Sequence, residues 1–168
     1  MASNPLPALA TGTGILIDAN IFIYALTGRS PQCRELLERS QSGDFGAVTT
    51  IEVINEICHR LMLLEALERR IIDKISAAAL RSKANEIASL TSYWKRIERV
   101  FDLNLTILTL DESRVRRAQR LRSAHGLLTN DSLIAAAAEE RGIRNLASSD
   151  KDFERVGWLT LYRPTDLA

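Results

Sequence analysis

The stretch Gly14-Ile15-Leu16-Ile17-Asp18 decides the fold, because it is a short apolar run that ends on a carboxylate. Runs of this kind are typical of strands that are buried on both faces of a parallel sheet. Asp18-Ala19-Asn20 then turns the chain, and Ile21 to Leu26 has the pattern of the first turns of a helix. The stretch predicts a buried strand that leads directly into a helix, with an acid at the junction.

Strand and helix patterns alternate along the rest of the chain. Strands are expected over 46–49, 103–110, 144–148 and 158–162, and helices over 32–40, 51–67, 111–125 and 132–141. Ser30-Pro31 and Thr50 are start signals for helices, and Gly126 and Gly142 are stop signals. This alternation favours an α/β fold with a mostly parallel sheet and helices on both faces.

The length of 168 residues fits one domain. A domain of this size buries enough surface to fold without disulfides or structural metals. Residues 1–13 contain Pro5, Pro7 and Gly12 without periodicity, and we expect a loose leader there. A single domain is expected over 14–168. It includes a helical segment at about 67–100, with two helices and a break between Ser82 and Ser92.

Composition excludes several classes of protein. The 22 basic and 21 acidic side chains give a net charge of +1, which excludes a polybasic tail and an acidic disordered segment. Cys33 and Cys58 form no C-x-x-C pair, which excludes a disulfide framework and a zinc site. There is no signal-peptide pattern and no run near the roughly 18 apolar residues of a membrane span. We therefore expect a cytoplasmic protein that does not bind membranes.

Four acidic positions fall where an α/β fold builds its sites. Asp18 closes the first strand, Asp150 follows the strand at 144–148, Asp131 begins a helix, and Glu56 lies in the first turns of another. The functional crevice of such a sheet lies outside the carboxyl ends of its strands, so these acids are expected to converge. Spacing alone does not decide between Glu52 and Glu56, or between Asp150 and Asp152, as the functional acid. Each acid taken singly also fits a structural role as a helix cap, a turn residue or a solvated surface charge.

Four carboxylates in one cleft repel each other unless a cation lies among them. Mg²⁺ prefers oxygen ligands and keeps several waters. A metal held in this way generates a nucleophile from water and neutralises charge on a phosphodiester. The hypothesis from the residues alone is a metal-dependent phosphodiesterase.

The same positions resemble the four motifs of the PIN domain family, in the order of that family. The motifs are Ile17-Asp18-Ala19-Asn20-Ile21-Phe22-Ile23-Tyr24, Thr49-Thr50-Ile51-Glu52-Val53-Ile54-Asn55-Glu56, Leu127-Leu128-Thr129-Asn130-Asp131-Ser132-Leu133-Ile134-Ala135-Ala136-Ala137 and Leu146-Ala147-Ser148-Ser149-Asp150-Lys151-Asp152-Phe153. Together they span almost the whole chain. The family register selects Glu56 over Glu52 and Asp150 over Asp152.

The resemblance implies a three-layer α/β/α sandwich and an endoribonuclease that depends on Mg²⁺ or Mn²⁺. It implies that Asp18, Glu56, Asp131 and Asp150 hold the metal, with Asp152 assisting through a water. Asn20 and Ser149 are expected to orient the ligand, and Thr50 to cap its helix. The chain is most similar to VapC-type toxins, which implies RNA as substrate, an antitoxin partner and a homodimer.

The helix expected over 111–125 is rich in arginine. Arg114, Arg116, Arg117 and Arg120 are candidates for an RNA-binding surface beside the acids, with a solvated helix face as the alternative. Aromatic residues are few, so recognition of the RNA backbone is expected more than base stacking.

Other functions share parts of this pattern. A haloacid-dehalogenase-type phosphatase needs a second Asp two residues after the first, and that place holds Asn20. A receiver domain needs a phospho-acceptor Asp and a later Lys, for which no convincing pattern is present. Two alternatives stay open. One is a stand-alone PIN nuclease in RNA processing, which could have the same extra length at 67–100. The other is a non-catalytic PIN module that only binds RNA or a partner.

Overall fold

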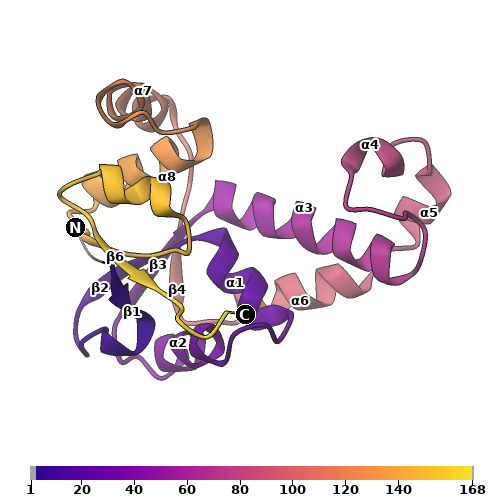
Figure 1. The fold of residues 1–168 in the computed structure, drawn as a ribbon, viewed down its shortest axis with the longest axis horizontal. Coiled ribbons are helices and arrows are strands. Elements are labelled where there is room, and N and C mark those ends of the chain that lie inside the picture. The colour runs from indigo at the N-terminus through magenta and orange to yellow at the C-terminus, as the bar shows by residue number, and fades with distance from the viewer. Residues whose placement is uncertain (1–2, 168) are drawn as a thin grey trace.

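A parallel sheet with helices on both faces forms the body of the computed structural model, which describes residues 3–167 (Figure 1). Across the sheet, the strands within this range are β1 (Asn4–Pro5), β6 (Thr160–Arg163), β5 (Asn145–Ala147), β2 (Gly14–Ile17), β3 (Gly46–Thr50) and β4 (Leu105–Leu108). All five pairings are parallel. This is the three-layer α/β/α architecture expected from the sequence.

Two groups of helices in the described range pack together. The helices are α1 (Ala19–Leu26), α2 (Pro31–Gln41), α3 (Ile51–Glu68), α4 (Ala77–Leu80), α5 (Ala84–Ala88), α6 (Ser92–Phe101), α7 (Glu112–His125) and α8 (Thr129–Glu140), with 3-10 turns η1 (Leu6–Ala8) and η2 (Lys151–Arg155). Helices α7 and α8 pack against each other, while α1 packs against α2 and α3. In Figure 1 these two groups lie on opposite sides of the sheet. No helix in residues 3–167 has the length and apolar character needed to cross a membrane.

The strand order places a crevice between β2 and β5. From β2 the chain continues to β3 on one side, and from β5 it continues to β6 on the other. The loops after β2 and β5 therefore diverge at the carboxyl edge, where ligands bind in open α/β sheets. Asp18 and Asp150 follow these two strands.

Side-chain caps begin several helices, as the sequence predicts. The Ser30 hydroxyl accepts a hydrogen bond from the Cys33 N–H at 3.0 Å, and Thr50 accepts one from the Val53 N–H at 3.4 Å. Asp111 likewise accepts from the Arg114 N–H at 2.8 Å. These caps fix where α2, α3 and α7 leave their preceding segments.

An arm projects from the sheet, formed by the outer half of α3 with α4, α5 and the start of α6 (Figure 1). It has its own small core of Leu63, Ala66, Ile72, Leu80 and Leu90. The prediction of two helices over 66–100 was wrong in its first half, where α3 ends at Glu68 and only the short α4 and α5 follow.

The end of α3 explains that error. Arg70 adopts a φ of 56°, and the Ile71 N–H donates to the Ala66 carbonyl at 2.9 Å, which closes the helix in the left-handed conformation usual for glycine. Because an arginine occupies this position, the sequence carries no stop signal there.

The expectation of a loose leader over residues 1–13 was wrong for residues 4–9; residues 1 and 2 lie outside the described range. Asn4 and Pro5 pair with β6, and Leu6 and Leu9 are buried in the main core. A proline is tolerated here because β1 is an edge strand, where an N–H can face solvent.

Candidate active site

The four predicted acids line one open pocket of about 340 Å³ at the carboxyl edge of the sheet. Its lining comes from the β2–α1 junction, α3, the start of α8 and the loop after β5, and comprises Asp18, Asn20, Ile23, Tyr24, Arg29, Glu56, Arg60, Leu64, Ile75, Asp131, Ser149 and Asp150. Residues separated by up to 132 positions in sequence therefore share one cavity. Its size is that of a small-ligand site.

Among the four pocket acids Asp18 is the most deeply buried, with only 6% of its surface exposed. Its Oδ1 accepts a hydrogen bond from the Ala19 N–H at 2.6 Å, and its Oδ2 accepts from the Ser148 hydroxyl at 2.6 Å and from the Asn20 amide. Both carboxylate oxygens are thus oriented by fixed donors before any ligand arrives.

Ser148 joins the two loops that carry Asp18 and Asp150. Its Oγ donates to Asp18 and accepts from the Asp150 N–H at 3.0 Å and from the Asn20 amide at 3.0 Å. The Asn20 Oδ1 in turn accepts from the Ser149 N–H at 2.9 Å. These contacts hold the ends of β2 and β5 in a fixed register around the pocket.

Burial and mutual repulsion raise the pKa of two of the acids. Desolvation raises the pKa of Asp18 to about 6; its hydrogen bonds oppose this, and the charges of Glu56 and Asp131 add to it. The pKa of Asp131 is raised by desolvation first, and then by Asp150, Asp152 and Glu56. The four carboxylates are close enough to repel one another, and a cation would relieve that repulsion.

The set of donors fits a hard divalent cation. Within residues 3–167, no three His, Cys, Asp or Glu side chains are drawn together into a ready-made metal site. The carboxylates instead surround an open pocket, which suits Mg²⁺, an ion that binds one or two carboxylates and keeps several waters.

In the structure, Glu52 and Glu56 occupy different environments, and so do Asp150 and Asp152. Glu56 lines the pocket and Glu52 does not; both carboxylate oxygens of Glu52 are buried without a hydrogen-bond partner in the described residues. Asp150 lines the pocket, whereas the Asp152 carboxylate pairs with Arg155 at 2.9 Å. Asp152 is nevertheless near enough to raise the pKa of Asp131.

The supporting polar residues occupy different places. Asn20 and Ser149 line the pocket, as predicted. Thr50 is fully buried and caps α3, so it acts on the site through the orientation of the helix that carries Glu56.

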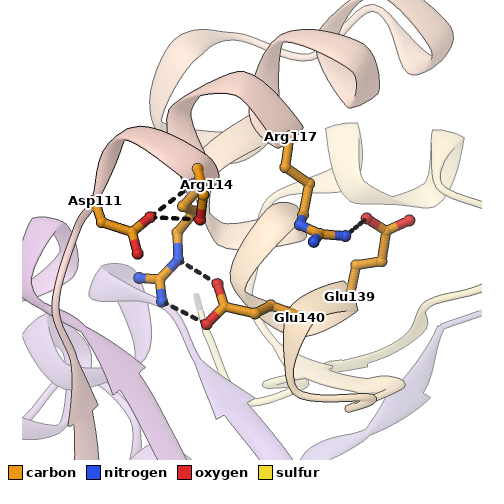
Figure 2. A network of polar contacts seen from close by, with 6 residues as sticks. Asp111, Arg114, Arg117, Glu139 and Glu140 are labelled. Atoms are coloured by element: carbon orange, nitrogen blue, oxygen red, sulfur yellow. Dashed lines mark hydrogen bonds and ion pairs between the residues drawn. The ribbon is translucent and has the colours of Figure 1, made fainter.

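Several arginines of the arginine-rich helix form ion pairs with glutamates of α7 and α8. Arg114 is 3% exposed and pairs with Glu140 at 3.0 Å, so its selection as an RNA-binding residue was wrong. Figure 2 shows Arg114 and Arg117 of α7 pointing toward Glu140 and Glu139 of α8. Arg116 pairs with Glu112, and Arg120 is exposed on the same helix. None of these four arginines lines the acidic pocket.

Three cationic or bridging residues at the site were missed from the sequence. Arg60 and Arg29 line the pocket, and Ser148 bridges its two loops. Arg60 stands four residues after Glu56, a spacing that places both on one helix face and could have indicated it. Ser148 lies directly after β5, two residues before Asp150, so its place at the strand end could also have indicated it. Arg29 reaches the site by stacking on Tyr24, a contact that no residue spacing predicts.

The chain belongs to the PIN domain family, because the model of that family matches residues 15–159. It is similar to Ribonuclease VapC2 of Methanocaldococcus jannaschii, with 26% identity over 148 residues, 88% of this chain and 91% of the relative.

Solved structures show the same fold. The VapBC2 structure from Rickettsia felis, bound to a DNA fragment from their promoter, matches with a TM-score of 0.59 and 16% identity, covering 89% of this chain and 98% of that one. VapC20 of Mycobacterium tuberculosis, a Sarcin-Ricin loop cleaving toxin, matches with a TM-score of 0.52 and 16% identity, covering 88% and 98%.

Proposed function

We propose that this protein is an endoribonuclease that depends on Mg²⁺ or Mn²⁺. The observation that carries this proposal is the convergence of Asp18, Glu56, Asp131 and Asp150 on one pocket at the crevice of the sheet. Membership of the PIN family and the likeness to a relative named as a ribonuclease favour RNA as the substrate.

The four carboxylates would hold the cation, and Asp152 would contribute through a water. When bound, the metal supplies an activated water and neutralises charge on the phosphodiester. Asp18 would meet it with both oxygens already oriented by Ala19, Asn20 and Ser148. Ser148 would hold Asp150 in position by accepting a hydrogen bond from its backbone N–H, and α3 would present Glu56 to the same pocket.

Cleavage of single-stranded RNA by the purified protein tests this function. The wild-type chain with Mn²⁺ should cut RNA internally, EDTA should stop the reaction, and Asp18→Asn should abolish it. Asp102→Asn, a matched change of an exposed acid at the end of α6, should leave the rate unchanged. Absence of cleavage with Mn²⁺ and Mg²⁺, or cleavage that survives Asp18→Asn, would overturn the assignment.

We further propose that the nuclease is the toxin of a toxin–antitoxin pair and works as a homodimer with an antitoxin partner. The names of the relatives, which include VapC and VapBC proteins, support the toxin and its antitoxin partner. Induced expression should stop growth, Asp18→Asn should relieve the arrest, and a small protein from a neighbouring gene should restore growth. Harmless expression of an active enzyme would instead support a stand-alone nuclease in RNA processing.

A further inference from the structure

The pocket has a second half that the carboxylates do not occupy. Beyond Glu56 its lining changes to two guanidinium groups, Arg29 and Arg60, and to Tyr24, Leu64 and Ile75. A cation site requires only the acidic half. The basic and apolar half therefore indicates that the pocket takes a larger ligand with an anionic part and a flat or apolar part.

The guanidinium group of Arg60 is placed to meet an anion beside the acids. Glu56, Arg60 and Leu64 follow one face of α3 at four-residue intervals, about 6 Å apart along the axis. Arg60 Nη2 lies 3.8 Å from Glu56 Oε1, too far for a hydrogen bond, and the side chain is 58% exposed. Arg60 therefore keeps donors for a ligand, and guanidinium binds phosphate through paired hydrogen bonds.

Tyr24 and Arg29 form a stacked pair that lines the same pocket. The Arg29 guanidinium lies over the Tyr24 ring, 5.1 Å from its centre, and the Arg29 N–H donates to the Tyr24 carbonyl at 2.8 Å. The Tyr24 hydroxyl lies 3.4 Å from Ser149 Oγ, next to Asp150. Aromatic rings and guanidinium planes are the surfaces on which proteins stack unpaired bases.

We infer that this half of the pocket is a nucleotide subsite for single-stranded RNA, in which Arg60 binds the phosphate next to the scissile one and the Tyr24–Arg29 pair stacks its base. This inference rests on the proposed function and specifies its substrate. Single strands are favoured over duplex because a base enclosed in an A-form helix offers no free face to Tyr24 or Arg29.

Binding measurements in the Asp18→Asn background, without added metal, test the subsite separately from cleavage. The probe is a short fluorescent single-stranded oligoribonucleotide. Arg60→Met should weaken its affinity about tenfold, the equivalent of about 1.4 kcal/mol, and reduce the salt slope of binding by about 0.7. Arg34→Met is the matched control, since Arg34 is 63% exposed and lies 4.0 Å from a glutamate four residues away.

The tyrosine is tested by a pair of substitutions. Tyr24→Leu should weaken binding about fivefold or more without changing the salt slope, because it removes a stacking surface and no charge. Tyr24→Phe should bind like the parent, since it keeps the ring. Duplex RNA of the same sequence should be insensitive to Tyr24→Leu.

Three outcomes distinguish the possibilities. RNA binding that depends on Arg60 and Tyr24, in a protein that cleaves no RNA, would uphold the subsite and overturn the proposed nuclease. The subsite alone would be overturned if the protein cleaves RNA while Arg60→Met and Tyr24→Leu bind RNA with the same affinity as the control Arg34→Met. If these two substitutions instead weaken neutralisation by a partner protein while RNA affinity stays unchanged, the half-pocket binds protein and the inference is wrong.

Discussion

The Asp18 carboxylate and the Ser148 hydroxyl lie 2.6 Å apart, although 130 residues separate them in the chain. The contact connects the end of β2 to the end of β5 across the crevice where the strand order reverses. It also compensates part of the cost of burying Asp18, because the hydrogen bond lowers a pKa that burial raises.

Removing the Ser148 hydroxyl should therefore weaken the site without unfolding it. Ser148→Ala should raise the pKa of Asp18 further, lower the rate of RNA cleavage about tenfold, and shift the pH–rate profile to higher pH. Ser123→Ala, on the exposed face of α7, is the control. A lower rate with an unchanged pH profile would contradict a role for Ser148 through Asp18.

The stability of the metal-free protein should depend on pH through Asp18. Its pKa is about 6 in the fold against an ordinary value of 3.8, so between these values the folded state keeps a proton that the unfolded chain releases. The free energy of unfolding should thus fall as pH rises through this window, by on the order of 3 kcal/mol, and saturating Mg²⁺ should reverse the loss. Denaturant unfolding at several pH values measures it, and Asp18→Asn should remove this part of the slope.

The ion pair between α7 and α8 should contribute to stability and not to RNA binding. Arg114→Ala removes a buried side chain and its ion pair with Glu140, whose side chain is 32% exposed and can be hydrated, so it should destabilise the fold by about 1–2 kcal/mol. Arg116→Ala removes an arginine that is 77% exposed and should change stability by less than about 0.5 kcal/mol. Chemical denaturation compares the two variants, and equal effects would argue against the burial of Arg114.

Glu65 should stabilise the packing of α6 against α3 within the arm. Its carboxylate is buried and accepts the Thr91 N–H at 3.1 Å and the Tyr93 N–H at 2.8 Å at the start of α6. Burial raises the pKa of Glu65, but these hydrogen bonds outweigh it and the net pKa is lowered, so its contribution is present above the ordinary 4.5 and is lost as pH falls below it.

Glu65→Ala should destabilise the arm by about 2 kcal/mol, because it leaves backbone donors of α6 unpaired. Hydrogen exchange should then speed up in α6 while the exchange of β2 stays slow. Glu68→Ala, an exposed neighbour 3.6 Å from Arg96, is the control. Uniform acceleration in both α6 and β2 would show that the arm and sheet unfold together.

The acids could be predicted because their positions depend on local rules. Asp18 ends an apolar strand and Asp131 begins a helix, and the topology of a parallel sheet brings such positions to one edge. The same rules could not reveal that Glu139 and Glu140 of α8 neutralise arginines of α7. That pairing depends on how two helices pack, which no spacing within either helix encodes.

The N-terminal strand shows a second limit of the sequence. Asn4 and Pro5 have no strand periodicity, and they join the sheet through pairing with β6 at residues 162 and 163. Such backbone pairing to an edge is independent of side-chain pattern.

The order of the strands also has a consequence for synthesis. β5 lies between β2 and β6, so the strand that precedes Asp18 lacks one neighbour until residues 145–147 have been made. Ser148 and Asp150 emerge from the ribosome after these residues, and β1 can pair with β6 only when residues 160–163 have also been made. The pocket is thus incomplete throughout most of translation. A nascent chain beside ribosomal RNA carries Asp18, Glu56 and Asp131 without the loop that completes them.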